Sequence, residues 1–266
     1  MGKFEQLVGF TGSVGNLTAY KMRGVDGIVV RQKGGVSKER IQNDLNFHRT
    51  RENNAEFGGR SAASRSIMAA LFPLKPLADY NIAGPLNALL RPIQVADPIG
   101  ARGQRSVELS KSPALLEGFS LNNKTSFESI VRAPLSVTVS RETMSAEVVI
   151  PELMPDINFK GQGKHPLYKL EAALGLVPDF FYSPERYKPS HPGYPLPLAC
   201  VTATTEWLPS KSRSEVTTLG LKLDFTPPDG HFTLMLSIGI WFGYPITANQ
   251  VQQVEYAGAA KVLRAV

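Results

Sequence analysis

Cysteine is almost absent from this chain, since Cys200 is the only one among 266 residues. An internal disulfide and a cysteine metal cluster are therefore excluded. No stretch approaches the ~20 apolar residues that a membrane span needs, and the N-terminus lacks the apolar core of a signal peptide. The sequence therefore predicts synthesis as a soluble cytoplasmic protein without a classical signal peptide. Release of an assembly from the cell stays open.

Phosphate-binding loops are missing as well. Gly9, Gly12 and Gly15 lie three residues apart, which matches neither G-x-G-x-x-G nor G-x-x-x-x-G-K-[ST], and a strand-like segment follows them. The stretch Gly161 to Lys164 also fails the second pattern, because His165 follows the lysine. We therefore expect no nucleotide to be held at these glycines.

Catalytic motifs are missing too. The four histidines, His48, His165, His191 and His231, are far apart and form no H-E-x-x-H pattern. No G-x-S-x-G motif exists, and Ser190 beside His191 has no evident third partner. The carboxylate pairs Glu142/Glu147 and Glu152/Asp156 are expected on solvated strands and loops. The sequence therefore predicts a protein that is not an enzyme, with no cofactor, no metal and no small-molecule substrate.

Positive charge is concentrated near the N-terminus. Residues 1–65 hold eleven Lys/Arg and six Asp/Glu, whereas residues 66–266 hold eighteen and seventeen. Such an arm is suited to an acidic surface, either a protein or a nucleic acid. Acidic residues interleave with the basic ones, which favours a protein surface.

The segment from Leu17 to Lys33 predicts a β-hairpin, because Asp26-Gly27 is flanked by β-branched and aromatic residues. An isolated hairpin is marginal in water, so it must pair with its own chain or with another. The residues expected at a subunit interface are Tyr20, Lys21, Arg23, Asp26, Gly27, Val29, Arg31 and Lys33. For nucleic acid, the expected contacts are Lys21, Arg23, Arg31, Lys33, Lys38, Arg40, Arg49 and Arg51, with Tyr20 and Phe47 as stacking residues.

The rest of the chain changes from helical to strand-like patterns near Arg132. Apolar spacing predicts a helix from about Thr50 to Phe72, with a break or a close backbone approach at Gly58-Gly59, and a second helix that stops before Pro92. Short strands separated by Pro and Gly follow. Alternating residues predict two strands over 135–150, and further strands are predicted at 167–177, 199–208, 215–225, 231–242 and 259–266. We therefore expect a mainly β, α+β fold. Its predicted parts are an N-terminal β-hairpin arm (1–48), a small helical region (49–132) and an Ig-like β-sandwich domain (133–266).

One long loop, residues 182–197, is rich in proline and tyrosine. It either connects strands or forms a contact surface through Tyr182, Tyr187 and Tyr194, because tyrosine is enriched at interfaces. A glycan-binding or peptide-binding sandwich is a third possibility. The glycan version requires Trp207 and Trp241 on the surface, whereas the apolar segment around Trp241 predicts that this residue is buried.

The first 60 residues resemble an uncharacterised Bacteroidota protein family of unknown function. The resemblance rests on Met1-Gly2-Lys3, on the stretch from Gly9 to Asn16, on Tyr20-Lys21 and on Val29-Val30-Arg31. It implies no activity.

These patterns favour a structural, self-assembling subunit of a homopolymeric filament, tube or phage-like particle, docked through its N-terminal arm. The alternative is a nucleic-acid-binding protein that uses the same basic arm.

Overall fold

The computed structural model describes residues 2–4, 10–22, 25–161, 164–184, 186–191, 200–225, 227–247 and 250–266. The chain forms two compact units, residues 1–51 and 52–266, which are described separately. Among the described residues, strands make up 37% and helices 26%. The prediction of a mainly β, α+β fold is therefore confirmed.

The first unit is built on a four-stranded antiparallel sheet. Across the sheet the strands are β1 (Gly2–Phe4), β4 (Ile28–Gln32), β3 (Leu17–Lys21) and β2 (Gly12–Val14). The short helices α1 (Lys38–Asn43) and η1 (Leu45–Phe47) follow. Ser37 caps α1 by accepting a hydrogen bond from the Arg40 backbone N–H.

The predicted hairpin is confirmed. β3 and β4 pair with Leu17 opposite Gln32 and Lys21 opposite Ile28. A tight turn at Gly15-Asn16 joins β2 to β3, and the positive φ of Gly15 (55°) is a conformation that glycine adopts without strain. Because β1 and β2 flank the hairpin, both of its strands find partners in their own chain.

The second unit has a long central sheet. Its strands, in order across the sheet, are β10 (Cys200–Thr204), β7 (Leu167–Pro178), β13 (Phe232–Thr247) and β14 (Gln250–Ala265), with β11 (Leu208–Pro209) also paired to β7. A second sheet consists of β12 (Thr217–Lys222), β6 (Ser145–Ile150) and β5 (Ser136–Ser140). A small pair, β8 (Phe180–Phe181) and β9 (Lys188–Pro189), forms a separate two-stranded sheet.

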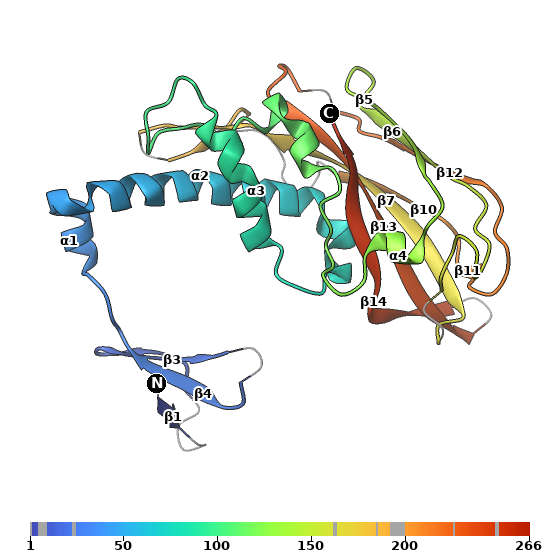
Figure 1. The fold of residues 1–266 in the computed structure, drawn as a ribbon, viewed down its shortest axis with the longest axis horizontal. Helices are drawn as coiled ribbons and strands as arrows, with labels where there is room; N and C mark the ends of the chain where they lie inside the picture. The colour runs from blue at the N-terminus through green and yellow to red at the C-terminus, as the bar shows by residue number, and fades with distance from the viewer. Residues whose placement is uncertain are drawn as a thin grey trace. The chain divides into compact units, whose positions relative to one another are not determined.

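Helices lie before the strands in the chain and cover one face of the central sheet (Figure 1). They are α2 (His48–Ala70), η2 (Phe72–Leu77), α3 (Ala83–Val95), η3 (Leu109–Lys111) and η4 (Pro113–Leu116). The short helix α4 (Phe127–Ile130) instead buries Phe127 and Ile130 in the core on the other face of this sheet. The sheet of β5, β6 and β12 packs on the opposite face.

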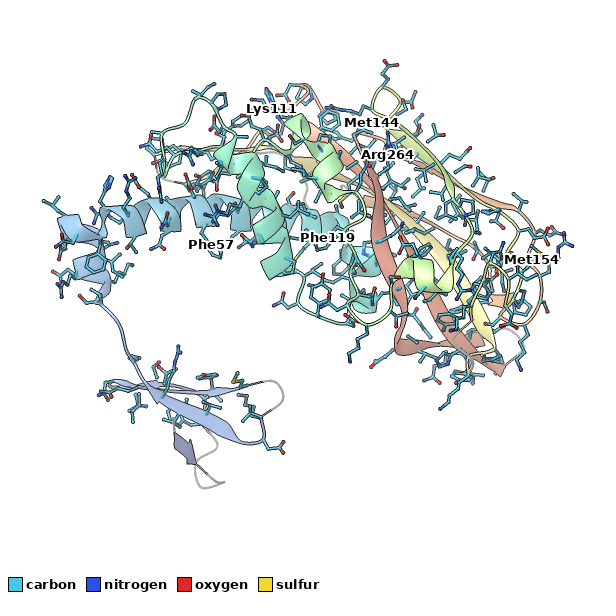
Figure 2. The ribbon with its side chains drawn as sticks, in the orientation of Figure 1. Phe57, Lys111, Phe119, Met144, Met154 and Arg264 are labelled. Atoms are coloured by element: carbon cyan, nitrogen blue, oxygen red, sulfur yellow. The ribbon has the colours of Figure 1, made fainter. Side chains whose placement is uncertain are left out.

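Two cores result from this layering. Along β13, Leu234 and Ile238 point into the core between the two sheets, whereas Met235 and Trp241 point toward the helices. The apolar run of β13 is continuous because both of its faces are covered. Figure 2 shows Phe119 in the layer before the strands and Met144 beside the second sheet. The helical layer and the strands therefore share a core, within one compact unit.

Two expectations about the helices need correction. The predicted first helix is confirmed as α2, but it is unbroken at Gly58-Gly59, and a side chain rather than a second backbone approaches it. A Cβ on Gly59 would lie 2.5 Å from Cε1 of Tyr187. The prediction that α3 stops before Pro92 is wrong. The helix continues to Val95, because Ile93 and Gln94, directly after the proline, are buried and their packing offsets the hydrogen bond that proline removes.

Candidate functional site

The sheet of the first unit has two faces of different chemistry. Residues directly opposite each other on neighbouring strands share a face, and so do residues two apart along one strand. From the register, one face, called the apolar face, carries Val14, Leu17, Ala19, Ile28 and Val30, with Lys21 and Gln32 at its margins. The polar face carries Ser13, Thr18, Tyr20, Val29 and Arg31.

The apolar face is incompletely covered. Val14 is 63% exposed and Leu17 is 46% exposed, and Phe10, Met22 and Leu45 of the same unit are exposed as well. Among the described residues of this unit, only Ala19 and Val29 are fully buried apolar side chains. A unit this small that buries so little apolar surface gains little stability from its own core.

The residues predicted from the sequence as an interface divide between these surfaces. Tyr20 and Arg31 meet on the polar face, where the Arg31 guanidinium lies 5.6 Å from the centre of the Tyr20 ring. Val29 lies on the same face as Tyr20 and is buried. Lys21 shares the apolar face at its margin.

The remaining predicted arm residues lie at turns. Asp26 and Gly27 form an exposed turn, in which Gly27 has a φ of 89°. Lys33 Nζ donates to the Gly15 carbonyl at 3.2 Å. Arg23 lies outside the described residues. The exposed apolar side chains were not predicted, because finding them requires the register of the sheet.

Several basic residues of the predicted nucleic-acid footprint already have partners within the first unit. Arg51 Nη1 donates to the carbonyls of Ile41 (2.8 Å) and Asp44 (2.9 Å). Arg40 Nε lies 3.2 Å from the Asp44 carboxylate. These contacts hold α1 and η1 together and leave fewer basic groups for phosphate.

Tyr187 of the predicted contact loop is a packing residue. Its ring lies against Gly59 of α2, and its hydroxyl donates to the Arg105 carbonyl at 2.8 Å and accepts from Gln94 Nε2 at 3.3 Å. Burial, together with the charge of Glu56, raises the pKa of Tyr187 to about 12. Tyr182 packs edge-on against the same ring, whereas Tyr194 lies outside the described residues.

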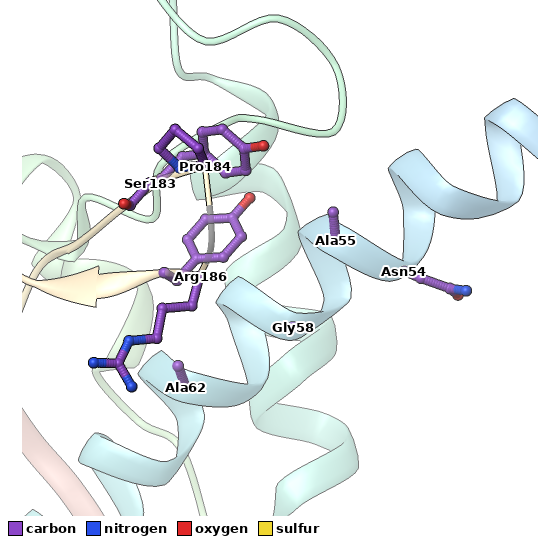
Figure 3. Close-up of a pocket in the computed structure, with 9 residues that line it drawn as sticks. Asn54, Ala55, Gly58, Ala62, Ser183, Pro184 and Arg186 are labelled. Atoms are coloured by element: carbon purple, nitrogen blue, oxygen red, sulfur yellow. The ribbon is translucent and has the colours of Figure 1, made fainter. Parts of the chain in front are cut away.

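A shallow pocket of about 390 Å³ lies between this loop and α2. Figure 3 shows Ser183, Pro184 and Arg186 of the loop beside Ala55 and Gly58 of the helix. The small residues Ala55, Gly58 and Ala62 of α2 leave space beside the rings of Tyr182 and Tyr187. No titratable pair suited to acid–base chemistry lines it among the described residues.

The residues considered for catalysis do not assemble. The Ser190 hydroxyl donates to the His231 carbonyl at 2.8 Å, and His191 Nε2 lies 3.0 Å from Asp229 Oδ1, so each of these side chains has a partner elsewhere. Glu152 is paired with Arg213. Asp156 lies in a turn with a φ of 63°.

One cluster was not visible in the sequence. Glu108, Asp179 and His231 bring ligand atoms within 4.8 Å of one another. Protein donors already occupy both carboxylates, because Asp179 accepts from the backbone N–H and the hydroxyl of Ser110, and Glu108 lies 2.7 Å from Lys111 Nζ. Burial raises the pKa of Asp179. The cluster is therefore a satisfied polar network, and the three residues are too far apart in sequence to be grouped by any local pattern.

Trp241 is buried, as the sequence predicted, and its indole N–H donates to Glu171 Oε2 at 2.7 Å. It cannot present its ring to a sugar. The glycan interpretation therefore loses one of the two tryptophans that it needs.

In the part of the chain that the structure describes, no helix is long and apolar enough to cross a membrane. No protein-family model matches the chain, and no curated protein or solved structure matches it. The resemblance of the first 60 residues to a Bacteroidota family stays a prediction.

Proposed function

We propose that the protein is a non-enzymatic, self-assembling structural subunit whose first unit docks onto another copy of the chain through the apolar face of its sheet. The carrying observation is the exposure of Val14 and Leu17 in a unit with only two fully buried apolar side chains among its described residues. Burying a side chain of this kind contributes roughly 1.5–3 kcal/mol. A neighbouring copy therefore supplies the cover that the unit does not supply itself.

The charge of the chain supports a second copy as the partner. Residues 1–51 hold nine Lys/Arg and four Asp/Glu, whereas residues 133–266 hold eleven and twelve. The positive unit would therefore meet a nearly neutral stranded region of a neighbour and not another positive surface. Because the two surfaces differ, the contact is head to tail, and it propagates into a ring or an open filament.

The mode of docking differs from simple strand addition at the hairpin. β3 and β4 are the inner strands of the sheet, so only β1 and β2 offer unpaired edges, and each is three residues long. A strand added at such a short edge gains few hydrogen bonds. The larger contribution comes from the apolar face.

A charge on the apolar face should dissociate the assembly. In Val14→Glu and Leu17→Glu a carboxylate would be buried at the contact, so we expect association to weaken at least tenfold. Ser13→Glu is the matched control, because Ser13 is also on β2 and also exposed but points to the polar face. Light scattering after size-exclusion chromatography, with electron microscopy of the same fractions, measures the change.

Wild-type protein that stays monomeric over a wide range of concentration and salt would refute the proposal. So would equal dissociation by Ser13→Glu and Val14→Glu. A monomer in which the apolar face is nevertheless protected from hydrogen exchange would show that the first unit packs on its own chain.

A nucleic-acid-binding arm is the second candidate, and the Arg31–Tyr20 pair on the polar face favours it, because a cation over an aromatic ring suits a stacked base. It predicts DNA or RNA binding that falls steeply with salt. Binding of that kind by monomeric protein, lost in Arg31→Gln but kept in Val14→Glu, would replace self-assembly as the explanation.

A further inference from the structure

Four arginines converge on one hollow in the helical layer of the second unit. Arg60 comes from α2, Arg91 from α3, and Arg102 and Arg105 from the segment between α3 and η3. The hollow has a volume of about 470 Å³, within the usual range for small-molecule sites. Its remaining lining residues are Asn53, Glu56 and Val95.

Carboxylates balance only part of this charge. Arg102 Nε lies 3.4 Å from Glu52 Oε2, and Arg105 Nη1 lies 3.8 Å from Glu56 Oε1. Neither Arg60 nor Arg91 forms an ion pair with any residue that the structure describes. Four guanidinium groups and two carboxylates thus leave two positive charges around the hollow.

The Arg60 guanidinium is held in place by a neutral group. Its Nη1 donates to Gln94 Oε1 at 2.6 Å. Gln94 is fully buried and is itself fixed, because its Nε2 donates to the Arg105 carbonyl at 2.9 Å and to the Tyr187 hydroxyl. Arg60 is therefore oriented before any ligand arrives, which reduces the entropy lost on binding.

Burial and a second arginine both oppose the charge of Arg60. Partial burial is the main cause of its lowered pKa; Glu56 raises the pKa, and the nearby charge of Arg91 lowers it by less than Glu56 raises it. Glu56 is already engaged, since it accepts from the Gly103 N–H at 2.9 Å. A negative group between Arg60 and Arg91 would relieve the repulsion between the two arginines.

We infer that this hollow, the arginine pocket of Arg60, Arg91, Arg102 and Arg105, binds a phosphate group. Two uncompensated guanidinium groups match a dianion, and phosphate carries about −1.5 to −2 near neutral pH, whereas one carboxylate would balance only one arginine. The planar guanidinium also matches the oxygens of phosphate with paired hydrogen bonds. The ligand is either the free anion or a small molecule that carries a phosphomonoester.

Calorimetry with the full-length protein tests this site, with inorganic phosphate as the probe and ionic strength held constant with sodium chloride. We expect saturable binding that weakens about tenfold or more in Arg91→Gln and in Arg60→Gln, since each removes a charge-assisted contact. Arg65→Gln is the matched control, because Arg65 is an exposed arginine of the same helix that does not line the pocket. Its affinity should change less than about twofold.

Circular dichroism checks that each variant is folded. If Arg60→Gln does not fold, Arg91→Gln still tests the site, because Arg91 is exposed and its replacement leaves the core intact. A parallel titration with glycerol 3-phosphate identifies the source: tighter binding than inorganic phosphate indicates an organic phosphate, and equal or weaker binding indicates the free anion. Absence of saturable phosphate binding would overturn the inference. Equal weakening in Arg65→Gln, or tighter binding of succinate than of both phosphates, would overturn it too.

Discussion

Replacing Gly258 by alanine is expected to destabilise the second unit by about 3–5 kcal/mol. Gly258 lies on β14 opposite Trp241, where the register with β13 shifts, and its φ is 118°. A left-handed conformation of this kind costs an L-residue roughly 1–3 kcal/mol. An added Cβ would also lie 2.0 Å from the Ile240 carbonyl oxygen, a backbone atom that no rotamer change can move aside. Overpacking adds about 1–3 kcal/mol.

Gly220→Ala is the matched control for this prediction. Gly220 also lies in a strand, β12, but a Cβ there would meet no atom within 4 Å, and its φ is not in the left-handed region. We expect the free energy of unfolding to change by at most about 1 kcal/mol, in either direction. Urea unfolding followed by the fluorescence of Trp207 and Trp241 measures both variants. The measurement error of such a free energy of unfolding is about 0.5 kcal/mol. A value for Gly258→Ala within about 0.5 kcal/mol of the wild-type value would contradict the close approach.

Gly258 also illustrates what the sequence could predict of the fold. The strand predicted at the C-terminus begins at Ala259, after the glycine, whereas β14 runs from Gln250 and continues through it. Local patterns treat glycine as a turn or a strand end. They do not show that a long partner strand, β13, continues opposite it and holds the bulge in place.

The strands themselves were predictable because their burial follows simple rules. The hairpin of β5 and β6 was predicted from alternating residues, and β7, β12 and β13 from short apolar segments between Pro and Gly. What the sequence could not show is that helices cover the second face of the central sheet. Ile67 of α2 and Met235 of β13 share one core, although the sequence places them in different predicted regions.

The candidate sites were harder to predict than the fold. The apolar face of the first unit depends on strand register, which sets which of two alternating residues point together. The arginine pocket depends on the packing of α2 against α3 and the segment after it. Its arginines are separated by up to about 45 residues in sequence, and singly they resemble ordinary surface arginines. Both sites arise from tertiary placement, on which local motifs carry no information.

Removing the Asp179 carboxylate should have the second largest effect, a loss of about 2–4 kcal/mol in Asp179→Ala at acidic pH. The carboxylate is fully buried and accepts from both the backbone N–H and the hydroxyl of Ser110, so alanine leaves two donors unsatisfied and a small cavity. Glu108, Lys111 and His231 are charged or titratable groups that interact with it.

The loss should depend on pH with a definite sign. Burial raises the pKa of Asp179, and the charge of Glu108 raises it further, against the hydrogen bonds from Ser110 and the charge of His231. The stability that Asp179 contributes is therefore fully present below its unfolded pKa of about 3.9, and it is lost as the pH rises through the folded value. The difference in unfolding free energy between wild type and Asp179→Ala should shrink as the pH rises.

Asp97 provides a comparison of opposite sign in the same unit. Burial acts to raise its pKa, but hydrogen bonds from the backbone N–H groups of Ile99, Ser106 and Gly100 lower it overall. Its contribution is thus present above the unfolded pKa and is lost as the pH falls through the folded value. Urea unfolding of both alanine variants between about pH 3.5 and pH 8 should give opposite trends, since the unfolded pKa of both residues lies near 3.9. Parallel trends would contradict the raised pKa of Asp179, because its carboxylate would then ionise as readily as that of Asp97. The carboxylate hydrogen-bonded to Ser110 would in that case be charged.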